Sequence, residues 1–183
     1  MKKLYYLLSG LLLFLGVYTQ AQNINWLSLN EALELQKTAP KKIIVDVYAN
    51  WCGPCKMLDT NTFQNEDVAN YINANFYAVK FNGEGDSEVT FKGKTYNNPD
   101  YDEKKKNSRN SAHDFTRALG ISAYPTIIYF DEKGEIIAPV PGYQSPQGLE
   151  MYLKLFNTDA HKNITSQEEF NEYYENFEPE FKS

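Results

Sequence analysis

The only two cysteines of the 183-residue chain, Cys52 and Cys55, lie two residues apart in the stretch 51–56, Trp-Cys-Gly-Pro-Cys-Lys. Such a pair suits thiol–disulfide exchange, in which one thiolate attacks a disulfide and a second thiol resolves the mixed disulfide. The apolar run 42–49 predicts a buried strand before the pair, and helix-favouring residues follow it, with Pro54 allowed in a first helical turn. We therefore expect Cys52 at a helix N-terminus, where unpaired backbone N–H groups lower the pKa of a thiol.

These positions predict that Cys52 is the exposed attacking thiol and that Cys55 is the buried resolving thiol. A zinc site is one alternative, but there is no second cysteine pair, and His113 and His161 stand at no recognisable ligand spacing. We predict that both histidines are surface residues and that no metal is bound. A purely structural disulfide is another alternative, although so short a loop would constrain the unfolded chain little.

The residues around the dithiol resemble the active site of the thioredoxin family. Residues 43–56 match the family's strand and its active-site motif, and the resemblance extends over about 24–156. It implies a thioredoxin-like α/β fold, with a central mixed β-sheet flanked by helices. It also implies a redox-active dithiol that acts on disulfide-containing proteins and needs no cofactor. Thr60 departs from the pattern, because the family has a helix-kinking proline at that position.

The resemblance also assigns roles outside the motif. Asp46 corresponds to the family's buried carboxylate, whose raised pKa would suit it to accept the proton of Cys55. The alternative for Asp46 is a strand residue that points at solvent. Lys80 corresponds to the lysine of the next strand, where it either tunes that acid or is exposed. Tyr124-Pro125 resembles the segment with the family's cis-proline, so the Tyr124 backbone would face the dithiol and pair with a substrate strand.

The direction of the reaction is predicted from the residues between the cysteines. Trp51, Gly53 and Pro54 are expected to form part of the substrate contact surface. Gly53-Pro54 lacks the histidine typical of oxidising relatives, so the resemblance favours a reductase that a membrane electron donor recharges. The alternatives are a disulfide oxidase or isomerase and, from another class, a binding or chaperone module in which the dithiol is incidental.

The first residues predict export. Lys2 and Lys3 precede an apolar run, 4–17, that is shorter than the about 20 residues needed to span a bilayer. Small residues end it, so 1–21 is interpreted as a cleaved secretory signal, which places the protein in the periplasm or outside the cell. The net charge of −6, without basic clusters, argues against nucleic acid as a partner, and we expect a monomer.

The remaining chain is divided into a thioredoxin-like domain, 22–160, and a C-terminal helical extension, 161–183. A polar insertion, 83–110, follows the third expected strand and contains a hairpin that turns on Lys92-Gly93. We predict that the insertion is a solvated surface decoration, with a docking role as the alternative. Strands are expected at 24–26, 42–49, 76–81, 127–130 and 135–140, and helices at 29–36, after 52, at 65–75, 111–119 and 147–156.

The extension is expected to form one last helix. Residues 165–168, Thr-Ser-Gln-Glu, match the capping pattern that starts a helix. The aromatic residues that follow recur at helical spacing, which is typical of a face that packs on a core. These residues are Phe170, Tyr173, Tyr174 and Phe177.

Overall fold

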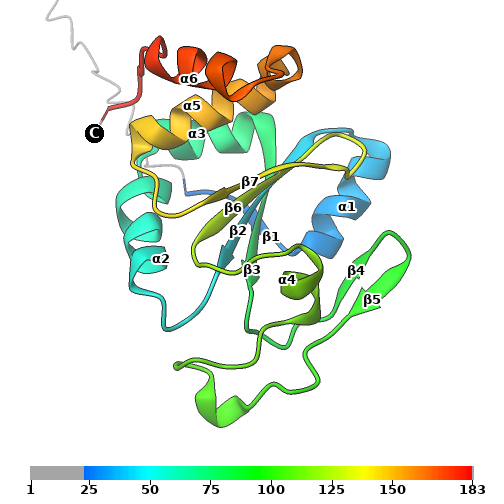
Figure 1. The fold of residues 1–183 in the computed structure, drawn as a ribbon. Coiled ribbons are helices and arrows are strands. Elements are labelled where there is room, and N and C mark those ends of the chain that lie inside the picture. Colours follow the sequence, from blue (N-terminus) through cyan, green and yellow to red (C-terminus); the bar gives the residue numbers. More distant parts are fainter. Residues whose placement is uncertain (1–22, 183) are drawn as a thin grey trace, which may run out of the picture.

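The computed structural model describes residues 23–182 (Figure 1). The predicted secretory signal, 1–21, lies outside this described part. Within it, no helix combines the length and the apolar character that a membrane span requires. The cleavage of the signal and the final location of the protein therefore remain predictions.

A single mixed sheet forms the centre of the domain, with its strands in the order β1-β3-β2-β6-β7. β3 pairs in parallel with both β1 and β2, whereas β6 is antiparallel to β2 and β7. The central strand β2 is buried along all but its last residue, as its continuous apolar run predicts. The strands are β1 (Trp26–Leu27), β2 (Lys42–Tyr48), β3 (Phe76–Asn82), β6 (Thr126–Phe130) and β7 (Ile136–Pro141).

Helices cover both faces of the sheet (Figure 1). One face packs against α2 (Gly53–Leu58), α3 (Glu66–Asn75) and α5 (Pro146–Asn157). The other face packs against α1 (Leu29–Thr38) and α4 (Asp114–Ala118). This arrangement confirms the predicted α/β fold with a mixed sheet between helices.

The extra C-terminal helix, α6 (Gln167–Glu175), lies over α5 (Figure 1). It starts one residue later than predicted, because Ser166 and Glu169 form the capping box. Its aromatic face packs on the core through Phe170 and Tyr173, together with Phe177 just beyond the helix. Tyr174 was expected in the same contact and is instead exposed.

Two predictions about the segment before α4 are wrong. The helix was expected from residue 111 and begins at Asp114, because the imidazole of His113 caps it by accepting the Phe115 N–H at 3.0 Å. His113 was expected on the surface and is fully buried, with Nε2 placed 2.8 Å from the Ser87 carbonyl oxygen. His161 is only half-buried and packs on the ring of Phe156.

The insertion contains the predicted hairpin, formed by β4 (Val89–Phe91) and β5 (Lys94–Tyr96). Lys92 and Gly93 both have positive φ, 50° and 74°, as a two-residue hairpin turn requires. Val89 and Phe91 are nevertheless buried, and the Phe91 ring contacts aromatic rings of α4 and β6. The prediction of a solvated decoration is therefore wrong for the hairpin, which covers part of the core.

Candidate active site

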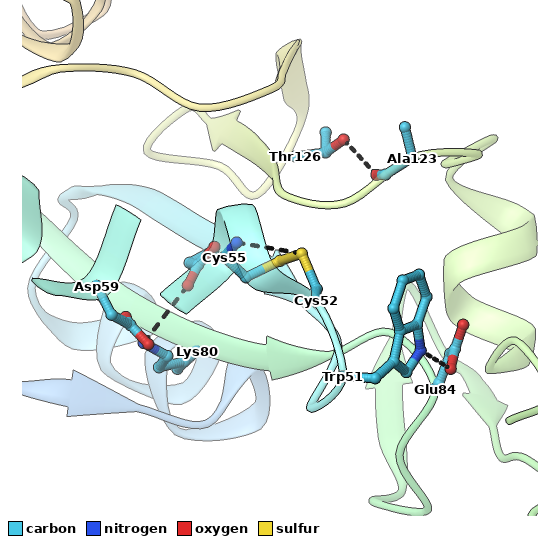
Figure 2. Close-up of a disulfide and its surroundings, with 9 residues drawn as sticks. Trp51, Cys52, Cys55, Asp59, Lys80, Glu84, Ala123 and Thr126 are labelled. Atoms are coloured by element: carbon cyan, nitrogen blue, oxygen red, sulfur yellow. Dashed lines mark hydrogen bonds and ion pairs between the residues drawn. A yellow bond between two sulfur atoms is a disulfide. The ribbon is translucent and has the colours of Figure 1, made fainter. Parts of the chain in front are cut away.

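The two cysteines form a disulfide at the start of α2 (Figure 2). Cys52 is the N-cap residue of this helix, and its Sγ accepts the backbone N–H of Cys55 at 3.1 Å. Pro54 occupies the first turn, as predicted. Because N–H groups at a helix N-terminus stabilise negative charge, this position favours a thiolate on Cys52 after reduction.

The expected contrast between an exposed and a buried cysteine is absent from the disulfide form. Cys52 is 2% exposed and Cys55 is 3% exposed. Aromatic side chains of Tyr48, Trp51 and Tyr124 pack against the pair. The disulfide can be approached from solvent at the start of α2. Gly53 and Pro54 are both exposed there, and a Cβ on Gly53 would have no atom within 4 Å.

Asp46 lies on β2 and is 1% exposed, so it does not point at solvent. Neither carboxylate oxygen has a hydrogen-bond partner among the described residues. Lys80, its register partner on β3, places Nζ 3.5 Å from Oδ2, which is an ion-pair contact without a hydrogen bond. Burial raises the pKa of Asp46 to about 7, with Lys80 lowering it and Asp59 raising it further. An acid with this pKa can exchange a proton near neutral pH.

Lys80 bridges two carboxylates. Its ammonium group contacts Asp59, at the end of α2 (Figure 2). This contact is closer than the one it makes with Asp46. The ammonium group also lies 4.9 Å from the centre of the Trp26 ring, and the Lys80 side chain is mostly buried. These contacts support the prediction that Lys80 lies beside the buried Asp46 and argue against the alternative that it is an exposed strand residue.

Where the thioredoxin family has a proline, the helix continues through a π-helical turn, Asp59–Phe63. The Thr60 hydroxyl donates to the Lys56 carbonyl oxygen at 2.9 Å. Turns of this kind bend helices without proline. Next to the turn, a cavity of about 280 Å³ is lined by Trp26, Asp59 and Lys80, among others, so the outer ion pair borders solvent.

The peptide bond between Tyr124 and Pro125 is cis, as the resemblance implied. The Tyr124 ring lies so close to Gly83 that a Cβ there would be 2.6 Å from its Cε1 and 2.8 Å from its hydroxyl oxygen. The hydroxyl therefore lies at the start of the insertion. Burial, followed by the charge of Glu84, raises the pKa of Tyr124 to about 12, so its side chain stays neutral.

A residue of the insertion, Glu84, holds the Trp51 side chain in place. Its indole N–H donates to Glu84 Oε2 at 2.7 Å (Figure 2). The ring also meets Tyr124 edge to face at 6.3 Å. Trp51 and Tyr124 thus stand together beside the disulfide. Among residues 23–182, no three His, Cys, Asp or Glu side chains are grouped closely enough to hold a metal ion.

A family model described as a thioredoxin-like domain matches residues 29–157. The chain belongs to this family. A thioredoxin-fold protein from Helicobacter pylori has a similar structure, with a TM-score of 0.58 and 17% identity, over 87% of this chain and 88% of that one. A putative disulphide-isomerase from Bacteroides thetaiotaomicron has a TM-score of 0.51 and 27% identity, over 77% of this chain and 98% of that one.

Among curated proteins, the thiol:disulfide interchange protein DsbD of Pectobacterium atrosepticum is 24% identical over 135 residues, which is 73% of this chain and 19% of the relative. The peptide-N(4)-(N-acetyl-beta-glucosaminyl)asparagine amidase of Caenorhabditis briggsae is 29% identical over 142 residues, which is 77% of this chain and 18% of the relative. The chain thus spans about a fifth of the length of these relatives.

Three residues of this thioredoxin-like site were missed in the sequence. Asp59 had a usable signal, because it follows Cys55 by one helical turn and so lies on the same side of the helix. Glu84 and Arg109 had none, because both belong to a polar insertion whose path the sequence does not specify. Arg109 places its guanidinium carbon 4.6 Å from the centre of the Trp51 ring.

Proposed function

We propose that the protein is a thiol–disulfide oxidoreductase of the cell envelope that reduces disulfides in other proteins. The observation that carries this proposal is the Cys52–Cys55 disulfide at the N-terminus of α2 in a thioredoxin-like domain. The name of the DsbD relative, a thiol:disulfide interchange protein, agrees with this chemistry.

In the reductive cycle, the Cys52 thiolate attacks one sulfur of a substrate disulfide and forms a mixed disulfide, and the other substrate sulfur leaves as a thiolate. Cys55 then attacks Cys52 Sγ, which restores the Cys52–Cys55 disulfide and releases the second substrate thiolate. Asp46 accepts the proton of Cys55 in this step, and its pKa of about 7 suits that role. Two electrons pass from the dithiol to the substrate.

The substrate is proposed to lie over the exposed start of α2. Gly53 and Pro54 offer a surface without side-chain obstruction, flanked by Trp51. Tyr124, next to the cis-Pro125, makes no backbone hydrogen bond with other described residues, so its N–H and C=O are available to an extended substrate strand.

The reductive direction follows from how little stabilises a thiolate on Cys52. Among the described residues, its Sγ accepts a hydrogen bond only from the Cys55 N–H, and Gly53-Pro54 adds no charge. The Tyr124 hydroxyl, which could have added a bond, lies against Gly83. Strong oxidants of this chemistry depend on a stabilised reduced form. Oxidised protein would be recharged by a membrane electron donor, and we propose a periplasmic monomer.

A disulfide isomerase is the second candidate, because the relative from B. thetaiotaomicron carries that name. The two activities differ in the reduction potential of Cys52–Cys55. Thioredoxin-type reductants have potentials of about −270 mV, and protein disulfide isomerase about −180 mV.

Two measurements test the proposal. The wild type should catalyse the reduction of insulin by dithiothreitol, and Cys52→Ser should not. Equal turbidity curves for the two proteins would contradict the oxidoreductase and favour a binding or chaperone module. Equilibration with glutathione should then give a potential nearer −270 mV than −180 mV, both approximate reference values. A potential above about −180 mV would reverse the direction to oxidase or isomerase.

A further inference from the structure

The last part of the insertion, residues 106–110, runs alongside the loop that leads into Cys52; we call it the arm. The Asn50 side chain donates to the Lys106 carbonyl oxygen at 2.7 Å. At the other end, the Asn110 N–H donates at 2.8 Å to Glu84 Oε2, the same oxygen that accepts the indole N–H of Trp51. The arm is therefore held at both ends against the two residues before the dithiol.

Between these two attachments, Arg109 lies over the Trp51 ring at 4.6 Å. It is exposed, and among residues 23–182 it has no acidic side chain within ion-pair distance. Glu84, the acid bound to Trp51, is already engaged by two N–H groups. A guanidinium group that rests on an aromatic ring by its face keeps its N–H donors at the edge, where a carboxylate can bind two of them.

The other charged residues of the insertion also show that Arg109 is available to an acidic partner. Two lysines of the insertion are neutralised by local acids, Lys105 by Asp102 and Lys106 by Glu103. Lys104 and Arg109 have no such partner among the described residues. The chain as a whole has a net charge of −6, and Arg109 places a positive charge without an acidic partner over Trp51, next to the disulfide.

We propose that Arg109 is a specificity-determining residue that favours protein disulfides with an aspartate or glutamate beside the cysteine. This proposal rests on the proposed oxidoreductase function and names the substrate class of the same site. A substrate strand that crosses Gly53-Pro54 passes next to Trp51, so a carboxylate near its cysteine can reach the edge of the guanidinium. Arg109 on the arm thereby supplies a positive charge that the segment 52–55, Cys-Gly-Pro-Cys, lacks.

The experiment uses the purified protein and two disulfide-linked peptides that differ only in the residue beside the cysteine, aspartate or asparagine. The wild type should reduce the acidic peptide with a kcat/KM about two- to fivefold higher, the range that an exposed ion pair gives. The preference should shrink as salt screens the charge. Arg109→Gln should bring the ratio of the two kcat/KM values to about one, and Arg109→Glu should reverse it.

Lys104→Gln is the matched control, because it removes the same charge from the same insertion without touching Trp51. It should keep most of the preference. An unchanged ratio in Arg109→Gln, or an equal loss in Lys104→Gln, would overturn the role of Arg109 while leaving the oxidoreductase intact. Failure of the wild type to reduce either peptide would instead contradict the proposed function itself.

Discussion

Two carboxylates are buried among the described residues, and their surroundings are opposite. Glu150 on α5 is 0% exposed, and its oxygens accept the backbone N–H groups of Glu180 and Phe181 at 2.9 and 2.8 Å. Lys154 pairs with it at 2.7 Å. Asp46 on β2 is as deeply buried, yet it accepts no hydrogen bond from the described residues and lies 3.5 Å from its nearest cation.

The difference distinguishes an acid that fixes part of the chain in place from an acid whose protonation can change near neutral pH. Donors around Glu150 satisfy its oxygens, and these hydrogen bonds fasten residues 180–181 to α5. Without donors, the anion of Asp46 is costly, and its pKa rises to about 7. The site therefore gives up stability to keep a group that can take up and release a proton. Each substitution below changes one side of this comparison.

The largest effect should follow removal of Glu150, the acid that fixes part of the chain in place. Glu150→Ala removes the acceptor of the Glu180 and Phe181 N–H groups and one of the two acids that pair with Lys154, the other being Glu180. Each lost hydrogen bond to a charged group costs about 1.5–3 kcal/mol. Denaturant unfolding should show this loss of stability. Below its unfolding midpoint the variant should still reduce insulin, because Glu150 is remote from the dithiol chemistry. A stability equal to that of the wild type would contradict the structural role.

Asp46→Asn should have the opposite effect on stability. The folded pKa of Asp46, about 7, exceeds its usual 3.8, so the folded state holds a proton that the unfolded state loses between these values. Stability from this group is complete below the unfolded pKa and is lost as pH rises through 7. The shift corresponds to a loss on the order of 4 kcal/mol. Asparagine cannot ionise, so it removes this pH-dependent loss of stability. The variant should therefore be more stable than the wild type at pH 8, and its stability should depend less on pH.

The same substitution should slow catalysis. Asparagine keeps the shape of the Asp46 side chain but cannot accept the proton of Cys55, and such groups contribute typically about 10²-fold. Turnover of Asp46→Asn in insulin reduction should fall by about this factor at pH 7 and recover towards alkaline pH, where hydroxide replaces the base. A pH–rate profile that matches the wild type would show that Asp46 takes no part in the proton transfer from Cys55.

The two acids also show what the sequence could predict. Asp46 was predictable because a charged residue inside the apolar run 42–49 stands out, and the dithiol beside it gave the run a known context. Glu150 gave no such signal, because a glutamate in a helix is ordinarily exposed and its partners lie about thirty residues further on. The burial of His113 and of the hairpin was hidden for the same reason: long-range contacts, rather than local pattern, decide both.

The smallest effect concerns Asp59, the second carboxylate on Lys80. It is partly exposed, competes with Asp46 for the ammonium group and raises the pKa of Asp46 by its charge. In Asp59→Asn this charge is gone and Lys80 is free to turn to Asp46, so the pKa of Asp46 should fall below about 7.

Because Asp46 must be ionised to accept a proton from Cys55, a lower pKa moves the acidic limb of the pH–rate profile of Asp59→Asn to lower pH. We expect a displacement of less than about one pH unit, since water screens a partly exposed charge. Glu66→Gln removes a carboxylate from the exposed surface of α3 and provides the control, which should leave the limb in place. A limb displaced to higher pH would mean that Asp59 supports the ionised form of Asp46, against the competition for Lys80 that the geometry indicates.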